Sequence, residues 1–128
     1  MGTVKNKNWS NRHMNNSDFT LLNRKQHSFI SESLPDDKLT ARMADFFSLF
    51  SDPTRLKILS VLSISEMCVG DIAALLRLNQ STVSHQLKLL KDAGMVSNTR
   101  SGKFITYEVA NPFIDEIMLT GVENCLKG

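Results

Sequence analysis

One stretch of the sequence decides the fold: residues 79–94, which read NQSTVSHQLKLLKDAG. Its apolar positions recur three and four residues apart, as they do on the buried face of an α-helix. This apolar stripe consists of Val83, Leu87 and Leu90, widened by Leu89 and Ala93. Asn79 or Ser81 can cap the first turn, and Gly94 suits the left-handed conformation that ends a helix. The stretch therefore predicts an amphipathic helix with defined ends.

The opposite face of this helix is polar and positive. It carries amides and hydroxyls near its beginning and Lys88 and Lys91 further on, with no acid before Asp92. Amides and hydroxyls can bond to base edges, whereas lysines neutralise phosphates, so we expect this face to contact DNA. The alternative is an ordinary amphipathic core helix. The polar residues of this surface are Gln80, Ser81, Thr82, Ser84, His85 and Gln86, and the last five are expected to face bases.

The segment before this helix predicts the first half of a helix-turn-helix. Residues 69–77 form a short expected helix, and residues 78–79 make a tight turn into the second helix. Its inward side chains would be Ile72, Ala73, Leu75 and Leu76. Two short helices joined by such a turn, with the second amphipathic and basic, are typical of a helix-turn-helix that binds DNA.

The segment after the helix predicts a β-hairpin. Residues 95–100 and 103–109 alternate in polarity or are β-branched, and residues 101–102 between them are typical of a two-residue turn. A hairpin that directly follows the second helix of a helix-turn-helix is a wing. Arg100 and Lys103 flank its tip, where they can reach phosphates beside the recognition helix.

Three more helices complete a mainly α-helical winged helix-turn-helix with one small β-hairpin. They are expected over 35–51, over 52–62 with Asp52 as cap and Pro53 first, and from Asn111 towards the C-terminus. The first and last carry more apolar residues than one small core takes, which predicts a homodimer through these two helices. These residues are Leu39, Met43, Phe46, Phe47 and Phe50, and Phe113, Ile114, Ile117, Met118, Val122 and Cys125.

The composition fits one domain, residues 35–127, preceded by a flexible arm, residues 1–34. The chain has 128 residues, 41% of them hydrophobic, and its polar arm shows at most a short helix around 19–29. The net charge of +2 is unevenly distributed along the chain, because residues 77–103 hold five basic residues and one acid. Such a basic stretch predicts an anionic partner. The absence of a signal peptide in residues 1–16 and the two cysteines favour the reducing cytoplasm, and no apolar run could span a membrane.

Four motifs carry a family resemblance. They are FFxLxSDPTRLKIL at 46–59, EMCVGDIA at 66–73, QSTVSHQLKLL at 80–90, and the wing through Tyr107. In these motifs the chain resembles the ArsR/SmtB family of small bacterial winged-helix repressors, over roughly residues 44–124. The resemblance implies a symmetric dimer, joined through its first and last helices. It would bind a palindromic operator and release it when an inducer arrives.

The resemblance also implies two places for a metal inducer. The first is partly present, because Cys68 and Asp71 match the family's Cys-Val-x-Asp motif, and a thiolate and a carboxylate can share zinc. Relatives complete this site from the arm, where this chain offers His13 and His27, and Gly70 replaces the second cysteine of soft-metal sensors. The second place is expected to be lost. Its four positions hold Asn111, Phe113, Asn124 and Lys127.

Two hypotheses for the inducer remain. One is a zinc-like divalent ion held by Cys68, Asp71 and the histidines of the arm. The other is thiol chemistry, in which Cys68 or Cys125 is oxidised, forms a persulfide or joins a disulfide. Either cysteine could instead fill a gap in the core, and for Cys125, on an apolar stripe, we favour that interpretation.

Other classes of function find less support. The sequence has no Gly-rich phosphate loop and no paired inward carboxylates, and Ser84 and His85 are helix neighbours that point apart, so we expect no enzyme. A winged helix that contacts protein instead of an operator is the alternative from another class. It would be favoured if salt failed to weaken any DNA complex.

Overall fold

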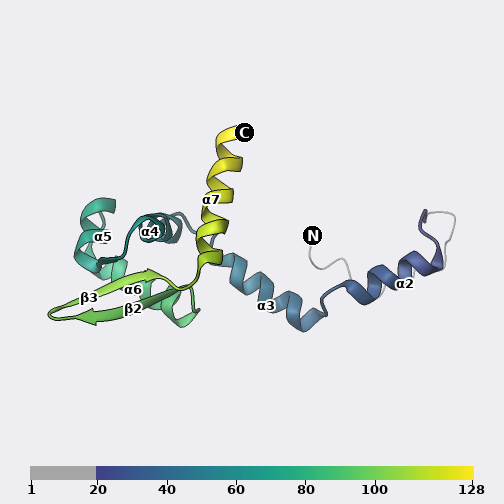
Figure 1. Cartoon of the computed structure of the whole chain (residues 1–128), viewed down its shortest axis with the longest axis horizontal. Helices are drawn as coiled ribbons and strands as arrows, with labels where there is room; N and C mark the ends of the chain where they lie inside the picture. Colours follow the sequence, from purple (N-terminus) through teal and green to yellow (C-terminus); the bar gives the residue numbers. More distant parts are fainter. Residues whose placement is uncertain (1–19) are drawn as a thin grey trace. The chain divides into compact units, whose positions relative to one another are not determined.

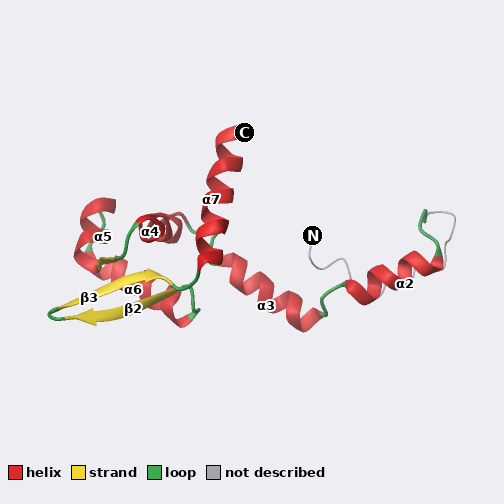
Figure 2. Ribbon diagram, in the orientation of Figure 1, coloured by secondary structure: helices red, strands yellow, loops and turns green. Residues whose placement is uncertain are grey.

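The computed structural model describes residues 20–128, which fall into two units that divide after Ala44. The first unit contains α2 (Arg24–Ser33) and the start of α3 (Asp37–Ser48) (Figure 1). The second unit contains the rest of α3, α4 (Pro53–Ile64), β1 (Met67–Cys68), α5 (Val69–Leu76), α6 (Gln80–Asp92), β2 (Val96–Ser101), β3 (Phe104–Val109) and α7 (Pro112–Lys127) (Figure 2). The mainly α-helical class is confirmed, and the boundary at residue 34 stays a prediction.

The core of the second unit lies where α4, α5, α6 and the hairpin meet. The apolar stripe of α6 is fully buried in it at Val83, Leu87 and Leu90, as predicted. Two other apolar residues were wrongly expected inside: Leu89 of α6 is 39% exposed and Leu75 of α5 is 62% exposed. Leu89 lies about 100° from Leu90, and Leu75 about 60° from Ile72, because successive residues of a helix rotate by about 100°. Ala93 is also exposed, at the end of α6.

A three-stranded antiparallel sheet covers one side of this core, with strand order β1-β3-β2. The strand β1 was not expected from the sequence, and it pairs Met67 with Tyr107 and Cys68 with Thr106. The turn of the hairpin also lies one residue later than predicted, since Ser101 pairs with Phe104. The two loop residues are therefore 102–103, and Gly102 at the first of them has φ +61, the conformation that a type II′ turn requires of glycine.

Local capping sets the ends of the helices. Asn23 and Gln26 form a capping box that starts α2 at Arg24, whereas the sequence suggested a helix from about residue 19. Helix α3 stops at Ser48 instead of residue 51, because the next three N–H groups bond three residues back, in tight turns. Asp52 then accepts from Arg55 N at 2.9 Å and caps α4, with Pro53 first, as predicted.

Among residues 20–128, no helix combines the length and the apolar character that crossing a lipid bilayer demands.

Replacing Leu87 with alanine should lower the free energy of unfolding by about 2–5 kcal/mol, because its fully buried side chain would leave a cavity. Leu89→Ala is the matched control on the same helix, and it should cost no more than about 0.5 kcal/mol. Urea unfolding at one fixed protein concentration measures both values. Equal losses in the two variants would contradict the assignment of the buried face.

Candidate DNA interface and metal half-site

The first turn of α6 is held by Asn79. Its Oδ1 accepts from the backbone N–H of Thr82 at 2.8 Å and from the hydroxyl of Ser81 at 2.9 Å. Asn79 is therefore the cap, and Ser81, the other candidate from the sequence, donates to it. Because the proton of Ser81 is engaged, its oxygen presents free lone pairs to the outside.

The predicted base-contacting side chains lie on the sides of α6 that the core leaves free. Thr82 and Gln86 are half-buried at the edge of this surface. Ser81, Ser84 and His85 are exposed, as are Gln80 beside them and Lys88 and Lys91, the two lysines predicted to bind phosphates. The burial of the apolar stripe on the opposite side fixes this direction, so the surface comes directly from the packing of the helix. Its contact with DNA stays a prediction.

Two groups of cations adjoin this polar surface. Lys88 forms an ion pair with Asp92 at 3.6 Å, with both side chains well exposed. Exposed pairs of this kind are weak, so Lys88 remains able to exchange Asp92 for a phosphate. Arg100 on β2 and Lys103 in the turn are exposed on the hairpin, whose strand β2 packs against α6 (Figure 1).

Gln86 has a partner that the sequence did not indicate. Its Oε1 accepts from Nη1 of Arg55 at 3.4 Å, and Nε of Arg55 donates to the carbonyl of Leu49 at 3.1 Å. The two bonded side chains are 31 positions apart in the sequence. Only the packing of α4 against α6 brings them together, so no local pattern could have revealed the contact.

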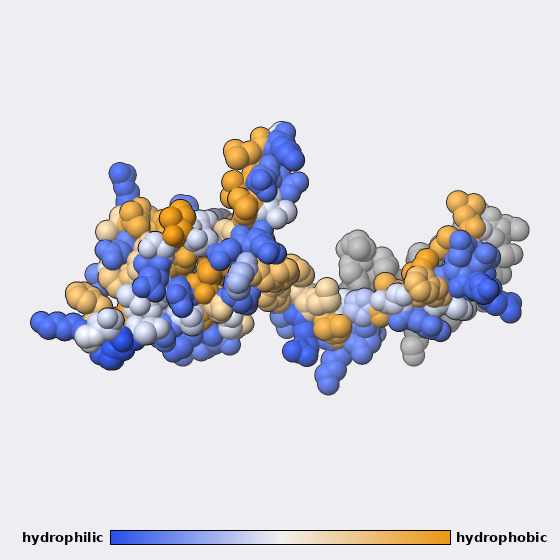
Figure 3. Space-filling model, viewed as in Figure 1, coloured by the Kyte–Doolittle hydropathy of each residue, from blue (hydrophilic) through white to orange (hydrophobic). Residues whose placement is uncertain are grey.

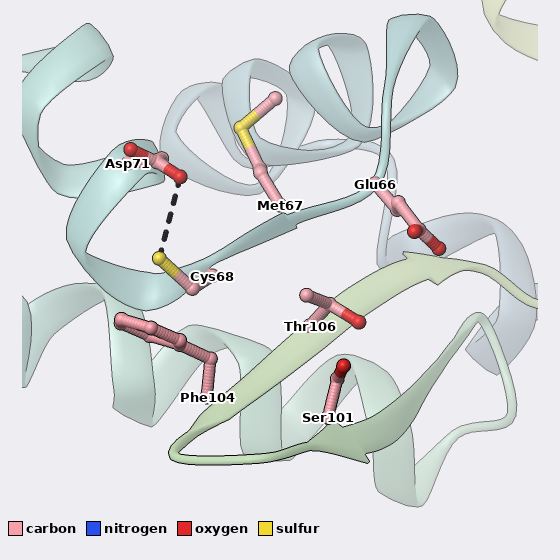
Figure 4. A pocket seen from close by; sticks show the side chains of 7 residues that line it. All are labelled: Glu66, Met67, Cys68, Asp71, Ser101, Phe104 and Thr106. Atoms are coloured by element: carbon pink, nitrogen blue, oxygen red, sulfur yellow. Dashed lines mark hydrogen bonds between the residues drawn. The ribbon is translucent and has the colours of Figure 1, made fainter.

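Cys68 and Asp71 meet at the start of α5, as the sequence predicted. Sγ of Cys68 lies 3.3 Å from Oδ2 of Asp71, in a hydrogen bond that the thiol donates (Figure 4). The pair opens into a hollow of about 330 Å³. The hollow is lined by Glu66, Met67, Cys68, Asp71, Ser101, Phe104 and Thr106. The last three come from the hairpin, so the pair faces the wing.

The donor set of this hollow fits half of a zinc site. A thiolate and a carboxylate are suitable ligands, but a structural zinc ion takes four. Glu66 points away from the pair (Figure 4), and no group of three or more His, Cys, Asp or Glu is found within residues 20–128. His27 is exposed on α2, in the other unit, and His13 lies outside the described residues. That these histidines complete the site stays a prediction.

The half-site also adjoins the recognition helix. A Cβ added at Gly70 would lie 3.9 Å from Sγ of Cys68 and 4.0 Å from Nε2 of Gln80. Gly70 therefore stands between the thiol and the first residue of α6. Both distances are ordinary van der Waals contacts, so a Cβ would fit in the position where soft-metal sensors were expected to have cysteine.

The remaining cysteine and the second expected metal site lie on α7. Cys125 is exposed, so our interpretation that it fills a gap in the core is wrong for the single chain. Two of the four positions of the second site have structural roles: Asn111 caps α7 through Phe113 N at 3.0 Å, and Asn124 donates to the carbonyl of Thr120 at 2.8 Å. The loss of that site stays a prediction.

Comparisons with known proteins show what this chain is similar to. A family model described as "Bacterial regulatory protein, arsR family" matches residues 52–98. The transcriptional repressor SmtB homolog of Synechocystis is 41% identical over 70 residues, 55% of this chain and about half, 53%, of that protein. The cadmium resistance transcriptional regulatory protein CadC of Listeria innocua is 38% identical over 84 residues, 65% of this chain and 71% of that protein.

Among solved structures, a homodimeric winged helix-turn-helix DNA-binding domain of Mycobacterium bovis is similar with a TM-score of 0.62 and 28% identity. The likeness covers 72% of this chain and 88% of that one. The predicted winged helix-turn-helix fold is thereby confirmed.

Replacing Lys103 with glutamine should weaken binding to every DNA sequence by a similar factor, because a phosphate contact carries no sequence information. The slope of log K against log salt should become shallower by about 0.9 for each phosphate contact that is lost, and a homodimer would lose two. Fluorescence anisotropy at several salt concentrations measures both effects. Lys127→Gln, at the end of α7, is the charge-matched control and should leave the slope unchanged. A loss confined to one DNA sequence would contradict the phosphate role.

Proposed function

Because the chain belongs to the arsR family of bacterial regulatory proteins, we propose that it represses transcription by binding an operator as a homodimer and releasing it when an inducer binds. The family consists of DNA-binding regulators, so the chain is no enzyme. The observation that carries the proposal is the exposed polar surface of α6, next to a hairpin with Arg100 and Lys103.

In this proposal α6 enters the major groove and the wing contacts the adjacent backbone. The bases are read by Ser81, Thr82, Ser84, His85 and Gln86, with Gln80 beside them. The phosphates are bound by Lys88, Lys91, Arg100 and Lys103. Hydroxyls and amides suit base edges, and cations on a flanking hairpin suit phosphates, which accounts for this division.

The homodimer is proposed to form through α3 and α7. Helix α7 carries apolar side chains that are each more than half exposed in the single chain: Phe113, Leu119, Val122 and Leu126 (Figure 3). Helix α3 likewise leaves Leu39, Met43 and Phe47 partly exposed. Apolar surface of this extent is usually covered by a partner. A two-fold dimer would present two copies of α6 to the half-sites of a palindromic operator.

A metal ion, with zinc as the first candidate, is the proposed inducer. The supporting observations are the 3.3 Å contact of Cys68 with Asp71 and the likeness to a cadmium resistance regulator. Zinc would supply the charge that holds a thiolate and a carboxylate together with donors from the arm, His13 and His27. Cys68 is main-chain paired with Thr106 of the wing, so a change at this site reaches a proposed DNA-contacting element directly.

A thiol-responsive repressor is the second candidate. It is supported by the exposure of Cys125 and by the fact that neither cysteine is in a disulfide. An accessible thiol can be oxidised or converted to a persulfide, whereas a buried one is inert. A module that binds protein instead of an operator is the third candidate, and a steep salt dependence of DNA binding would exclude it. The cytoplasm stays the predicted location.

Gln86→Ala should lower the affinity for the preferred operator by about 1–3 kcal/mol and should affect scrambled DNA less. The physical reason is that a base contact contributes only where the correct base is present. Anisotropy titrations with the two duplexes at one salt concentration measure the difference. An equal loss on both duplexes would refute the role of Gln86 in reading bases.

Zinc should release wild-type protein from its operator and should fail to release Cys68→Ser, because the half-site would lose its thiolate. Cys125→Ser is the matched control and should respond as wild type does. Anisotropy with and without added zinc gives the answer for all three proteins. If zinc leaves the wild-type complex intact, zinc is not the inducer. Oxidant and persulfide treatment of the same three proteins then tests the second candidate.

A further inference from the structure

Arg55 connects three parts of the second unit. Its backbone N–H bonds to the Asp52 cap at 2.9 Å, so its own position at the start of α4 is fixed. Its guanidinium bonds through Nε to the Leu49 carbonyl at 3.1 Å and through Nη1 to Oε1 of Gln86 at 3.4 Å. The Arg55 and Gln86 side chains are both half-buried, at the edge of the DNA-facing surface proposed above.

The chemistry of this contact fixes the orientation of the Gln86 amide. A guanidinium group has five N–H donors and no acceptor, so only the amide oxygen can face it. The NH2 group of Gln86 must then point away from Arg55. An unrestrained glutamine can offer both ends of its amide and bond bidentately to adenine, through N6 and N7. The bond to Arg55 uses one of the two lone pairs of this oxygen and directs the oxygen towards α4, so the NH2 donors are the part of Gln86 that points away from Arg55.

We propose that Arg55 is a positioning residue that determines specificity. It holds Gln86 so that the NH2 group donates to a base edge that presents hydrogen-bond acceptors. Guanine presents such an edge with N7 and O6, so guanine is the base that this arrangement selects. The inference rests on the proposed role of Gln86 in reading bases. It adds the residue that sets the orientation of the Gln86 side chain, and it adds the type of base that this orientation selects.

The bond to Leu49 gives Arg55 its rigidity. A guanidinium fixed at Nε by a main-chain carbonyl and by its own helix start has little freedom to turn. Lysine cannot replace it, because a single ammonium lacks the planar fork that reaches two acceptors in fixed directions. Leu49 follows directly on α3, so the contact also ties the reading side chain to the end of the proposed dimer helix.

The test uses the full chain and two duplexes, one selected from a randomised library by the wild-type protein and one with its bases scrambled. The measured quantity is the ratio of their dissociation constants. Arg55→Lys and Arg55→Met should each reduce this ratio roughly threefold to tenfold, the size of one lost hydrogen bond. In a Gln86→Ala background, neither change should reduce it further, because the two residues act as one unit.

The identity of the base gives a second readout that a merely structural role would not move. At the position where the wild type prefers guanine, Arg55→Met should accept adenine nearly as well, since its Gln86 amide is free to turn. Arg55→Lys retains the charge, so it controls for the loss of charge in Arg55→Met. Thermal unfolding of both variants controls for loss of the fold.

Three results would overturn the proposal. The first is an equal weakening on both duplexes by Arg55→Met with a shallower salt slope, which would make Arg55 a phosphate contact. The second is an undiminished ratio in both Arg55 variants while Gln86→Ala reduces it, which would leave base reading by Gln86 intact. The third is an undiminished ratio in Gln86→Ala itself, which would refute the proposed function of Gln86 and this inference together.

Discussion

The burial of one face of α6 is the constraint on which the rest of the structure depends. Val83, Leu87 and Leu90 reach zero exposure in a core shared with α4, α5 and the hairpin. Because their positions are set, the remaining directions of the helix are set with them. The hydroxyls, amides and lysines of the proposed DNA-facing surface owe their common orientation to this packing. A rotation of the helix by one residue, about 100°, would turn the apolar stripe away from the core and bring one polar flank towards it.

Local chemistry made much of the fold predictable. Caps such as Asn79 and Asp52 act within three residues, so their effect is visible in a short window of sequence. Apolar residues three and four positions apart likewise revealed the helix α6, and alternation revealed the hairpin. The wrong predictions have local causes too. Leu89 is apolar but lies off the buried stripe of α6. The hairpin turn lies one residue later than predicted, which places Gly102 where φ is positive.

Contacts between distant residues could not be predicted in the same way. The strand β1 has two residues, too few for any periodicity, and exists because β3 offers it a free edge. The bond from Arg55 to Gln86 depends on how two helices pack. Of the proposed metal site, the sequence indicated Cys68 and Asp71, which share one helix start. Its remaining ligands depend on the arm, whose place relative to this unit no local rule determines.

The pairing of β1 with β3 has a consequence for how such a regulator can diversify. The ladder joins Cys68 to Thr106 through main-chain atoms, which every amino acid except proline supplies in full. The side chains of the wing can therefore change to suit a new operator without breaking the connection to the thiol. Conversely, the ligands around Cys68 can change to suit another signal while the strand remains paired. Signal and target can thus evolve separately on a shared backbone.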